Sequence, residues 1–165
     1  MDHCDGCGFD YELDRAEGAG AVIRAGVGEL AGLLERDDVE LRTRRRTDQW
    51  SPLEYGCHVR DVLLVQRERV LMACVADTPS FDPMNRDQRV ELDGYAHQDP
   101  AAVARQLRDA GLMFANVLAR FDPDVWERTL MYNYPAPWER SLRWVAVHTQ
   151  HEIVHHLGDV RAQLG

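Results

Sequence analysis

The fold is decided by the stretch SPLEYGCHVRDVLLV, residues 51–65, which has the features of a helix start. Ser51 stands at the N-cap position, Pro52 at the first helical position, and Glu54 three residues after the cap. This spacing predicts a capping box, because the serine and glutamate side chains can each accept a hydrogen bond from a free backbone N–H group. We therefore expect a long helix that continues to about Ala76.

Three other segments share this helical character. One begins at Asp99-Pro100 with the same capping logic, and two more run roughly from Leu13 to Glu35 and from about Ser141 to the C-terminus. The first of the four helices is weakened by five glycines, which help only where another element packs close to them. Apolar residues of the third helix recur at three- and four-residue steps and predict a buried stripe of Val103, Leu107, Ala110, Phe114, Val117 and Phe121.

Long connections separate these helices. Residues 78–98 form a crossover rich in Pro and Asp between the second and third helices, and residues 122–140 join the third to the fourth. Neither connection contains a convincing series of strands. Four amphipathic helices with two long connections predict an all-α fold, a four-helix bundle with crossovers, in a single domain over residues 1–165. Within it, residues 1–12 form an N-terminal segment with a Cys-x-x-Cys pair.

The composition excludes several classes of function. The 165 residues are 45% hydrophobic and 28% charged, and their apolar runs are far shorter than the roughly 18 residues that span a bilayer. A formal net charge of −9 argues against binding to nucleic acids or anionic membranes. The first residues lack the basic start and apolar stretch of an export signal, so a cytoplasmic protein is expected. All basic residues are arginines, which excludes a Schiff-base lysine and a P-loop.

Histidines are concentrated in the last expected helix. Residues 148–156 hold four of the seven histidines, a cluster that either lies by chance on a solvated face or binds a metal. Residues 151–155 match the zincin pattern His-Glu-x-x-His. We expect this match to be accidental, because a metalloprotease needs a further ligand downstream and only ten residues follow.

A helical wheel with about 100° per residue divides this cluster. Glu152 and His156 fall on the apolar side that faces the bundle interior, four residues apart, so both can reach one ion. A buried, unpaired carboxylate is costly, and a divalent metal would compensate its charge. His58, on the inward stripe of the second helix, is the natural third ligand, although a lone histidine on such a stripe can also be a plain core residue. The flank of the helix is expected to carry His148, His151 and His155.

Two short motifs resemble the DinB/YfiT-like superfamily. They are Trp50-Ser51-Pro52 followed by His58, and Glu152-x-x-x-His156-x-x-Asp159 in the last helix. The resemblance covers most of the chain. It implies a four-helix bundle in which three ligands from the second and last helices hold a divalent metal, commonly zinc or nickel, with open positions for water.

The ligand pattern also implies a chemistry. One branch of the superfamily uses three histidines, and another, the mycothiol-dependent maleylpyruvate isomerase type, uses His, Glu and His. His58, Glu152 and His156 fit the second branch. The resemblance implies an enzyme that activates a low-molecular-weight thiol such as mycothiol at the metal, for S-transfer to an electrophilic substrate or for isomerisation. Asp159 is expected to orient a ligand imidazole.

Four residues depart from the family pattern. Cys4-x-x-Cys7 and His151-x-x-x-His155 have the pair spacings of a zinc site with two Cys and two His ligands. Our hypothesis is a second, closed, structural zinc that fastens the N-terminal segment to the last helix. The alternative is a frayed tail that carries two idle thiols.

Other functions stay open at this point. A metal-binding bundle without catalysis, acting in stress or binding a partner, is compatible with the same ligands, and so is a metal-dependent hydrolase that uses bound water. The ligands would also accept iron or manganese. The glycine-rich first helix could face a second copy of the chain, which leaves a homodimer open.

Overall fold

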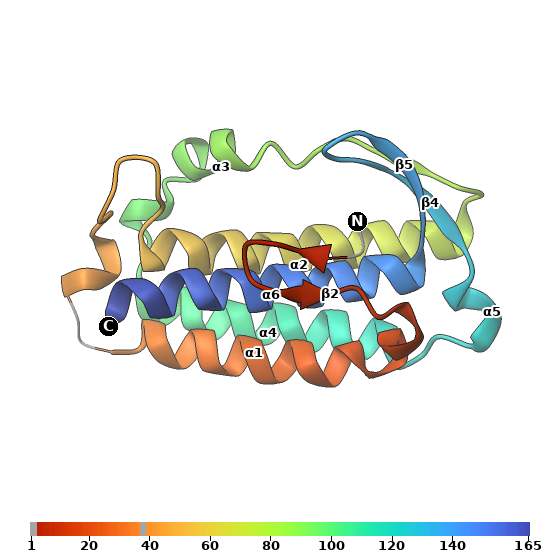
Figure 1. Cartoon of the computed structure of the whole chain (residues 1–165), viewed down its shortest axis with the longest axis horizontal. Helices are drawn as coiled ribbons and strands as arrows, with labels where there is room; N and C mark the ends of the chain where they lie inside the picture. Colours follow the sequence, from red (N-terminus) through yellow and green to blue (C-terminus); the bar gives the residue numbers. More distant parts are fainter. Residues whose placement is uncertain (1–2, 37–38) are drawn as a thin grey trace.

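Four long helices form the core of the structure, a computed structural model that describes residues 3–36 and 39–165. The helices are α1 (Ala19–Leu34), α2 (Pro52–Val75), α4 (Pro100–Leu118) and α6 (Leu142–Leu164). α1 and α6 run in one direction, and α2 and α4 in the other (Figure 1). Both α1 and α2 pack against α4 and α6, so α1 lies diagonally across the bundle from α2. The predicted all-α bundle is confirmed.

The helix starts follow the expected chemistry. Ser51 Oγ accepts a hydrogen bond from the Glu54 backbone N–H at 3.3 Å, and Glu54 Oε2 accepts one from the Ser51 N–H at 2.7 Å. Asp99 caps α4 and Ser141 caps α6 in the same way, each through the backbone N–H three residues on. The caps thus determine where α2 and α6 begin, whereas the apolar periodicity of these helices determines which side chains face inward.

The first expected helix is divided into two parts. Residues Leu13–Gly18 form the 3-10 helix η1, and α1 begins only at Ala19. One glycine of α1 does permit close packing, because a Cβ atom on Gly26 would lie 2.7 Å from Cγ2 of Ile153. Its small size therefore lets α1 approach α6.

The stripe predicted for α4 forms part of the core. Val103, Leu107, Ala110 and Phe114 are at most 1% exposed. The last two members of the stripe, near the end of α4, are half-buried against the same core.

The connections contain strands that the sequence pattern did not predict. Between α2 and α4 lie β3 (Ser80–Phe81), α3 (Arg86–Leu92) and η3 (Tyr95–His97). Between α4 and α6 lie α5 (Pro123–Trp126), β4 (Thr129–Asn133) and β5 (Pro137–Ser141). β3 pairs in parallel with β4, Phe81 opposite Tyr132, and β5 pairs antiparallel to β4, Tyr132 opposite Trp138. The small sheet thus joins the two crossovers, whose strands are about fifty residues apart and too short to show a period of two.

A short β-hairpin precedes the helices of the bundle. β1 (His3–Cys4) and β2 (Phe9–Asp10) pair antiparallel, and the hairpin lies along α6 (Figure 1). The remaining element, η2 (Val39–Arg42), precedes α2. Among the described residues, no helix combines the length and the hydropathy that crossing a membrane requires.

Truncation of the α4 stripe tests this packing. Leu107→Ala is expected to lower the free energy of unfolding by about 2–5 kcal/mol, because the fully buried side chain leaves a cavity between helices. Leu112→Ala is the matched control in the same helix, since Leu112 is 46% exposed and its truncation should change stability by no more than about 0.5 kcal/mol. Equal losses in the free energy of unfolding of the two variants, measured by urea denaturation, would contradict the assigned buried and exposed faces of α4.

Candidate metal centre

The three residues predicted to bind the metal lie together between α2 and α6. Single ligand atoms of His58, Glu152 and His156 are within 4.8 Å of one another. Glu152 Oε2 is 3.8 Å from His58 Nε2 and 3.7 Å from His156 Nε2. These distances are too long for hydrogen bonds, yet close to the roughly 3.4 Å between two ligand atoms that each lie about 2.0–2.1 Å from a tetrahedral ion. The predicted convergence is therefore present.

The histidine nitrogens suit a metal. His58 is 2% exposed, and within residues 3–36 and 39–165 neither of its ring nitrogens has a hydrogen-bond partner. Buried nitrogens without a partner are uncommon because they lose hydration without compensation, and an ion at Nε2 would satisfy one of them. His156 Nδ1 lies 2.9 Å from Asp159 Oδ2, which leaves Nε2 toward Glu152. Asp159 thus occupies the orienting position expected from the sequence.

The protonation states also suit a cation. Burial raises the pKa of Glu152, but the imidazoles of His151, His156 and His58 outweigh this effect and hold the pKa well below its usual value. Burial lowers the pKa of His58, so that its ring is neutral at pH 7. Burial also lowers the pKa of His156, but Asp159 and Glu152 more than reverse this and raise it to about 9. The Glu152 charge is thus balanced by a proton on His156, and a divalent ion can take the place of that proton.

Glu152 has two further imidazoles beside its other oxygen. Oε1 is 3.5 Å from His151 Nδ1 and 3.9 Å from His148 Nε2. His148 was expected on the flank of α6, and the structure adds that the N-terminal segment and β4 cover this flank. Tyr11 Oη lies 2.9 Å from His148 Nδ1, and the ring of Tyr132 packs edge-on against the same imidazole. Burial lowers the pKa of His148 to about 4, so this ring is neutral. The four-residue spacing between His148 and Glu152 was the sequence signal that could have predicted this proximity.

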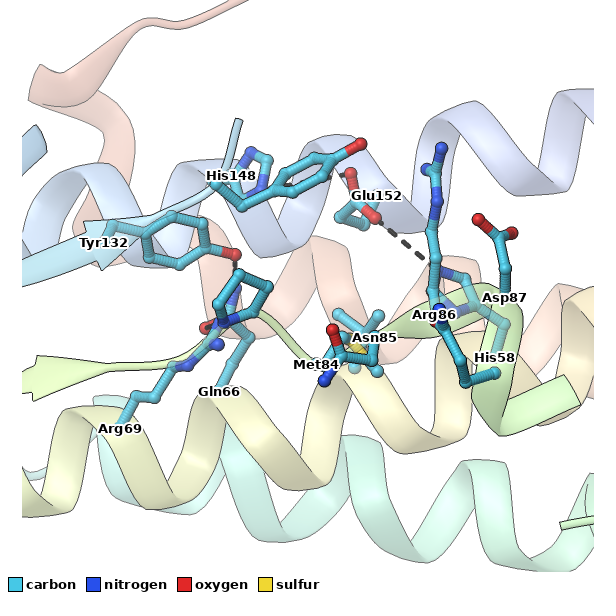
Figure 2. Close-up of a pocket in the computed structure, with 14 residues that line it drawn as sticks. His58, Gln66, Arg69, Met84, Asn85, Arg86, Asp87, Tyr132, His148 and Glu152 are labelled. Atoms are coloured by element: carbon cyan, nitrogen blue, oxygen red, sulfur yellow. Dashed lines mark hydrogen bonds and ion pairs between the residues drawn. The ribbon is translucent and has the colours of Figure 1, made fainter. Parts of the chain in front are cut away.

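A cavity of about 240 Å³ opens from His58 and Glu152 (Figure 2). One face of α2 and two residues of α6 form its floor, and residues 83–88 of the crossover cover it together with Tyr132 and Tyr134. His156 is buried and is not part of the cavity wall. The candidate centre is therefore accessible from one side and enclosed on the other.

A buried cation lies further along the cavity. Arg69 is 6% exposed, its Nη2 donates to the Asp82 carbonyl at 2.7 Å, and its Cζ lies 4.8 Å from the Tyr132 ring centroid. In the part of the chain that the structure describes, its hydrogen bonds go to neutral acceptors, the Asp82 carbonyl and the Gln66 side chain, and not to a carboxylate. It follows His58 by eleven residues, about 16 Å along a helix. Sequence reasoning missed Arg69, although it shares the helical face of His58, Val62 and Gln66.

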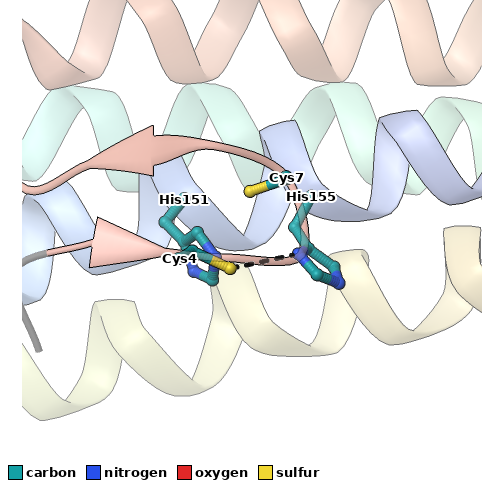
Figure 3. Close-up of side chains that lie close together, drawn as sticks. All are labelled: Cys4, Cys7, His151 and His155. Carbon is teal, nitrogen blue, oxygen red and sulfur yellow. Dashed lines mark hydrogen bonds between the residues drawn. The ribbon is translucent and has the colours of Figure 1, made fainter.

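The N-terminal cysteines also meet α6. Cys4, Cys7, His151 and His155 each offer a ligand atom within 4.8 Å of the others (Figure 3). Burial raises the pKa of Cys4, but His151 and nearby backbone N–H groups outweigh this effect and lower it to about 6. Residues 3–12 form a hairpin and an extended approach to α6 instead of a frayed tail. The structure thus brings together all members of both predicted ligand sets.

Two further groups overlap with these sets. They consist of His148 with His151 and Glu152, and of His155 with His156 and Asp159. Both lie wholly on α6, whereas each predicted set joins α6 to another part of the chain. An ion in either group would compete for residues of the predicted sets.

Removal of the Asp159 carboxylate tests the orientation of His156. Asp159→Asn is expected to weaken metal binding by about 10–100-fold, because a neutral amide replaces the charged carboxylate that accepts from His156 Nδ1 and orients Nε2 toward Glu152. Competition with a chromophoric chelator measures the affinity, and a Cys4→Ser/Cys7→Ser background confines the measurement to this site. Asp109→Asn, on the exposed face of α4, is the control. Equal affinities in the two variants would contradict this role for Asp159.

Comparisons with known proteins agree with the fold. Among solved structures, the chain is similar to YfiT from Bacillus subtilis, a probable metal-dependent hydrolase with an unusual four-helix bundle topology. The sequence identity is 16% and the TM-score 0.79, over 92% of this chain and 89% of that chain, which establishes a shared fold. No match is found among curated proteins. The DinB superfamily matches residues 25–160, a range that includes all three candidate ligands. The chain therefore belongs to the DinB superfamily.

Proposed function

We propose that the chain is a metal-dependent enzyme that activates a low-molecular-weight thiol of the mycothiol type, for S-transfer to an electrophilic small molecule or for its isomerisation. The divalent ion, zinc or nickel, would be held by His58, Glu152 and His156. The observation that carries the proposal is the cavity that opens on His58 and Glu152. A structural ion is enclosed by four protein ligands, whereas three ligands beside a cavity leave a coordination position for a reactant.

The residues around the site have separable tasks. A bound ion would supply the Lewis acidity that lowers the pKa of a thiol or of water. Asp159 keeps His156 in one orientation, and Tyr11 does the same for His148 beside Glu152. The crossover residues 83–88 and Tyr132 separate the cavity from bulk water.

The position of Arg69 in the cavity wall favours a thiol cofactor in addition to the metal. Its guanidinium can bind an anionic or strongly polar group by charge-assisted hydrogen bonds. The roughly 16 Å of helix between His58 and Arg69 suits an extended ligand, with its reactive end at the metal and its polar end at the arginine. An attacking water molecule needs no such second anchor.

A metal-dependent hydrolase is the second candidate. The likeness to YfiT, itself a probable metal-dependent hydrolase, favours it, and the same three residues would serve if water took the place of the thiol. A bundle that binds metal without catalysis is less compatible with the open side of the site.

A conjugation assay separates these functions. Metal-loaded protein is incubated with mycothiol or bacillithiol and the electrophile monochlorobimane, and the fluorescent conjugate is followed. We expect conjugation that requires both metal and thiol, that His58→Ala abolishes, and that His97→Ala, at an exposed position outside the site, retains. Metal-dependent hydrolysis of p-nitrophenyl esters without any thiol would favour the hydrolase instead. Absence of both activities in metal-loaded protein would contradict the enzymatic proposal.

The role of Arg69 is tested by the kinetics of conjugation. Arg69→Gln should raise KM by roughly tenfold or more while kcat changes little, because hydrogen bonds to a charged group contribute about 1.5–3 kcal/mol to binding. Arg67→Gln is the matched control, since Arg67 pairs with Glu68 and does not line the cavity. A fall in kcat with unchanged KM would contradict a substrate-binding role for Arg69.

A further inference from the structure

We propose that Cys4, Cys7, His151 and His155 bind a structural zinc ion that joins the N-terminal hairpin to α6. This site shares no ligand with the centre described above and does not depend on the proposed enzymatic function. As in a zinc finger, the ligands come from a β-hairpin and a helix, although here the two elements lie far apart in the sequence.

The distances in this cluster suit zinc. The four ligand atoms lie within 4.8 Å of one another, and Cys4 Sγ is 3.7 Å from His155 Nδ1. In a tetrahedral site with bonds of about 2.3 Å to sulfur and about 2.0–2.1 Å to nitrogen, sulfur and nitrogen are roughly 3.6 Å apart. The separation of Cys4 Sγ from His155 Nδ1 is therefore already that of two zinc ligands.

His151 gives an independent reason for a ligand. Its side chain is buried, with 6% of the residue exposed, and both ring nitrogens lack a hydrogen-bond partner among the described residues. A buried imidazole normally pairs at least one nitrogen. Coordination of zinc would satisfy this requirement at His151.

The hairpin itself needs an anchor. Its strands have two residues each, and even longer isolated two-stranded hairpins are marginally stable in water. The turn nevertheless closes directly on α6, since a Cβ atom on Gly6 would lie 3.1 Å from Cε1 of His155 and 3.8 Å from the Cys4 sulfur. A metal between the turn and the helix would hold this close contact.

The arrangement is that of a ββα zinc finger. Cys4 ends β1 and Cys7 lies in the turn of the hairpin, while His151 and His155 lie on one face of the helix (Figure 3). Two thiolates and two imidazoles in a tetrahedron select zinc over magnesium or calcium. With four protein ligands the site is closed, so its role is structural. The inner face of α6 is buried in the bundle and the chain carries a net charge of −9, which argues against the nucleic-acid binding of many zinc fingers.

The proposed zinc would also stabilise the wall of the bundle site. Phe9 and Tyr11 follow the cysteines, and each ring centroid lies 5.4 Å from that of His151. His151 Nδ1 in turn lies 3.5 Å from Glu152 Oε1. Loss of this zinc should therefore loosen the surroundings of Glu152 without removing a ligand of the bundle metal.

Elemental analysis of zinc-loaded protein, prepared without an affinity tag and freed of loose metal by gel filtration, tests the proposal. Cys4→Ser/Cys7→Ser should lose one zinc ion per chain relative to wild type, and the matched control Cys74→Ser should lose none. His58→Ala/His156→Ala should keep the ion that depends on the cysteines. Unchanged zinc in Cys4→Ser/Cys7→Ser would overturn the proposal even if the bundle site is confirmed.

A second measurement uses the wild-type chain and so does not depend on the folding of a variant. Cobalt-substituted protein should show sulfur-to-cobalt charge-transfer absorption in the near ultraviolet, with the visible spectrum of a tetrahedral ion. Blocking of the thiols with an organomercurial should release one zinc ion per chain from the zinc form. Cobalt binding without the sulfur band, or no zinc release, would overturn the proposal whatever the bundle site binds.

Discussion

The charge of one carboxylate governs the architecture around the centre. Glu152 lies between four imidazoles, two beside each of its oxygens, from His58, His148, His151 and His156. A carboxylate in this environment is stable only where cationic or hydrogen-bonding groups compensate for lost hydration. The N-terminal segment and β4 pack against two of these rings, through Phe9 and Tyr11 on His151 and Tyr132 on His148.

Local rules account for much of the fold. The capping box of α2 and the stripe of α4 depend on residues within one or two turns of a helix, so the sequence could predict both. The convergence of His58 with Glu152 and His156 was also predictable, because a bundle places inward faces of facing helices opposite one another. The role of these residues as ligands stays a prediction.

The features that the sequence did not predict depend on contacts between segments that are far apart in the chain. The pairing of Phe81 with Tyr132 joins residues about fifty positions apart, and such short strands carry no local signal. The position of His148 could not be derived from an isolated helical wheel, because Tyr11 and Tyr132 bury a side of α6 that the wheel treats as flank. Arg69 becomes a candidate binding residue only once β4 is seen to cover the cavity.

The same helix serves two chemically different sites. One face of α6 offers a carboxylate and an imidazole next to a cavity, which suits a reactive ion with an open position. The adjacent face offers two imidazoles to two thiols, which suits an enclosed ion. Because Phe9 of the N-terminal hairpin packs on His151, and His151 adjoins Glu152, the hairpin also supports the bundle site.

The most direct test of the central claim is the metal content of the bundle site. Protein purified without a chelator or an affinity tag is analysed for divalent metals beside its His58→Ala/His156→Ala variant, both in the Cys4→Ser/Cys7→Ser background. The account predicts about one ion per chain in the parent protein and none in the variant, since three protein ligands become one. Equal metal content in the two, or none in the parent after zinc or nickel loading, would contradict a metal centre at His58, Glu152 and His156.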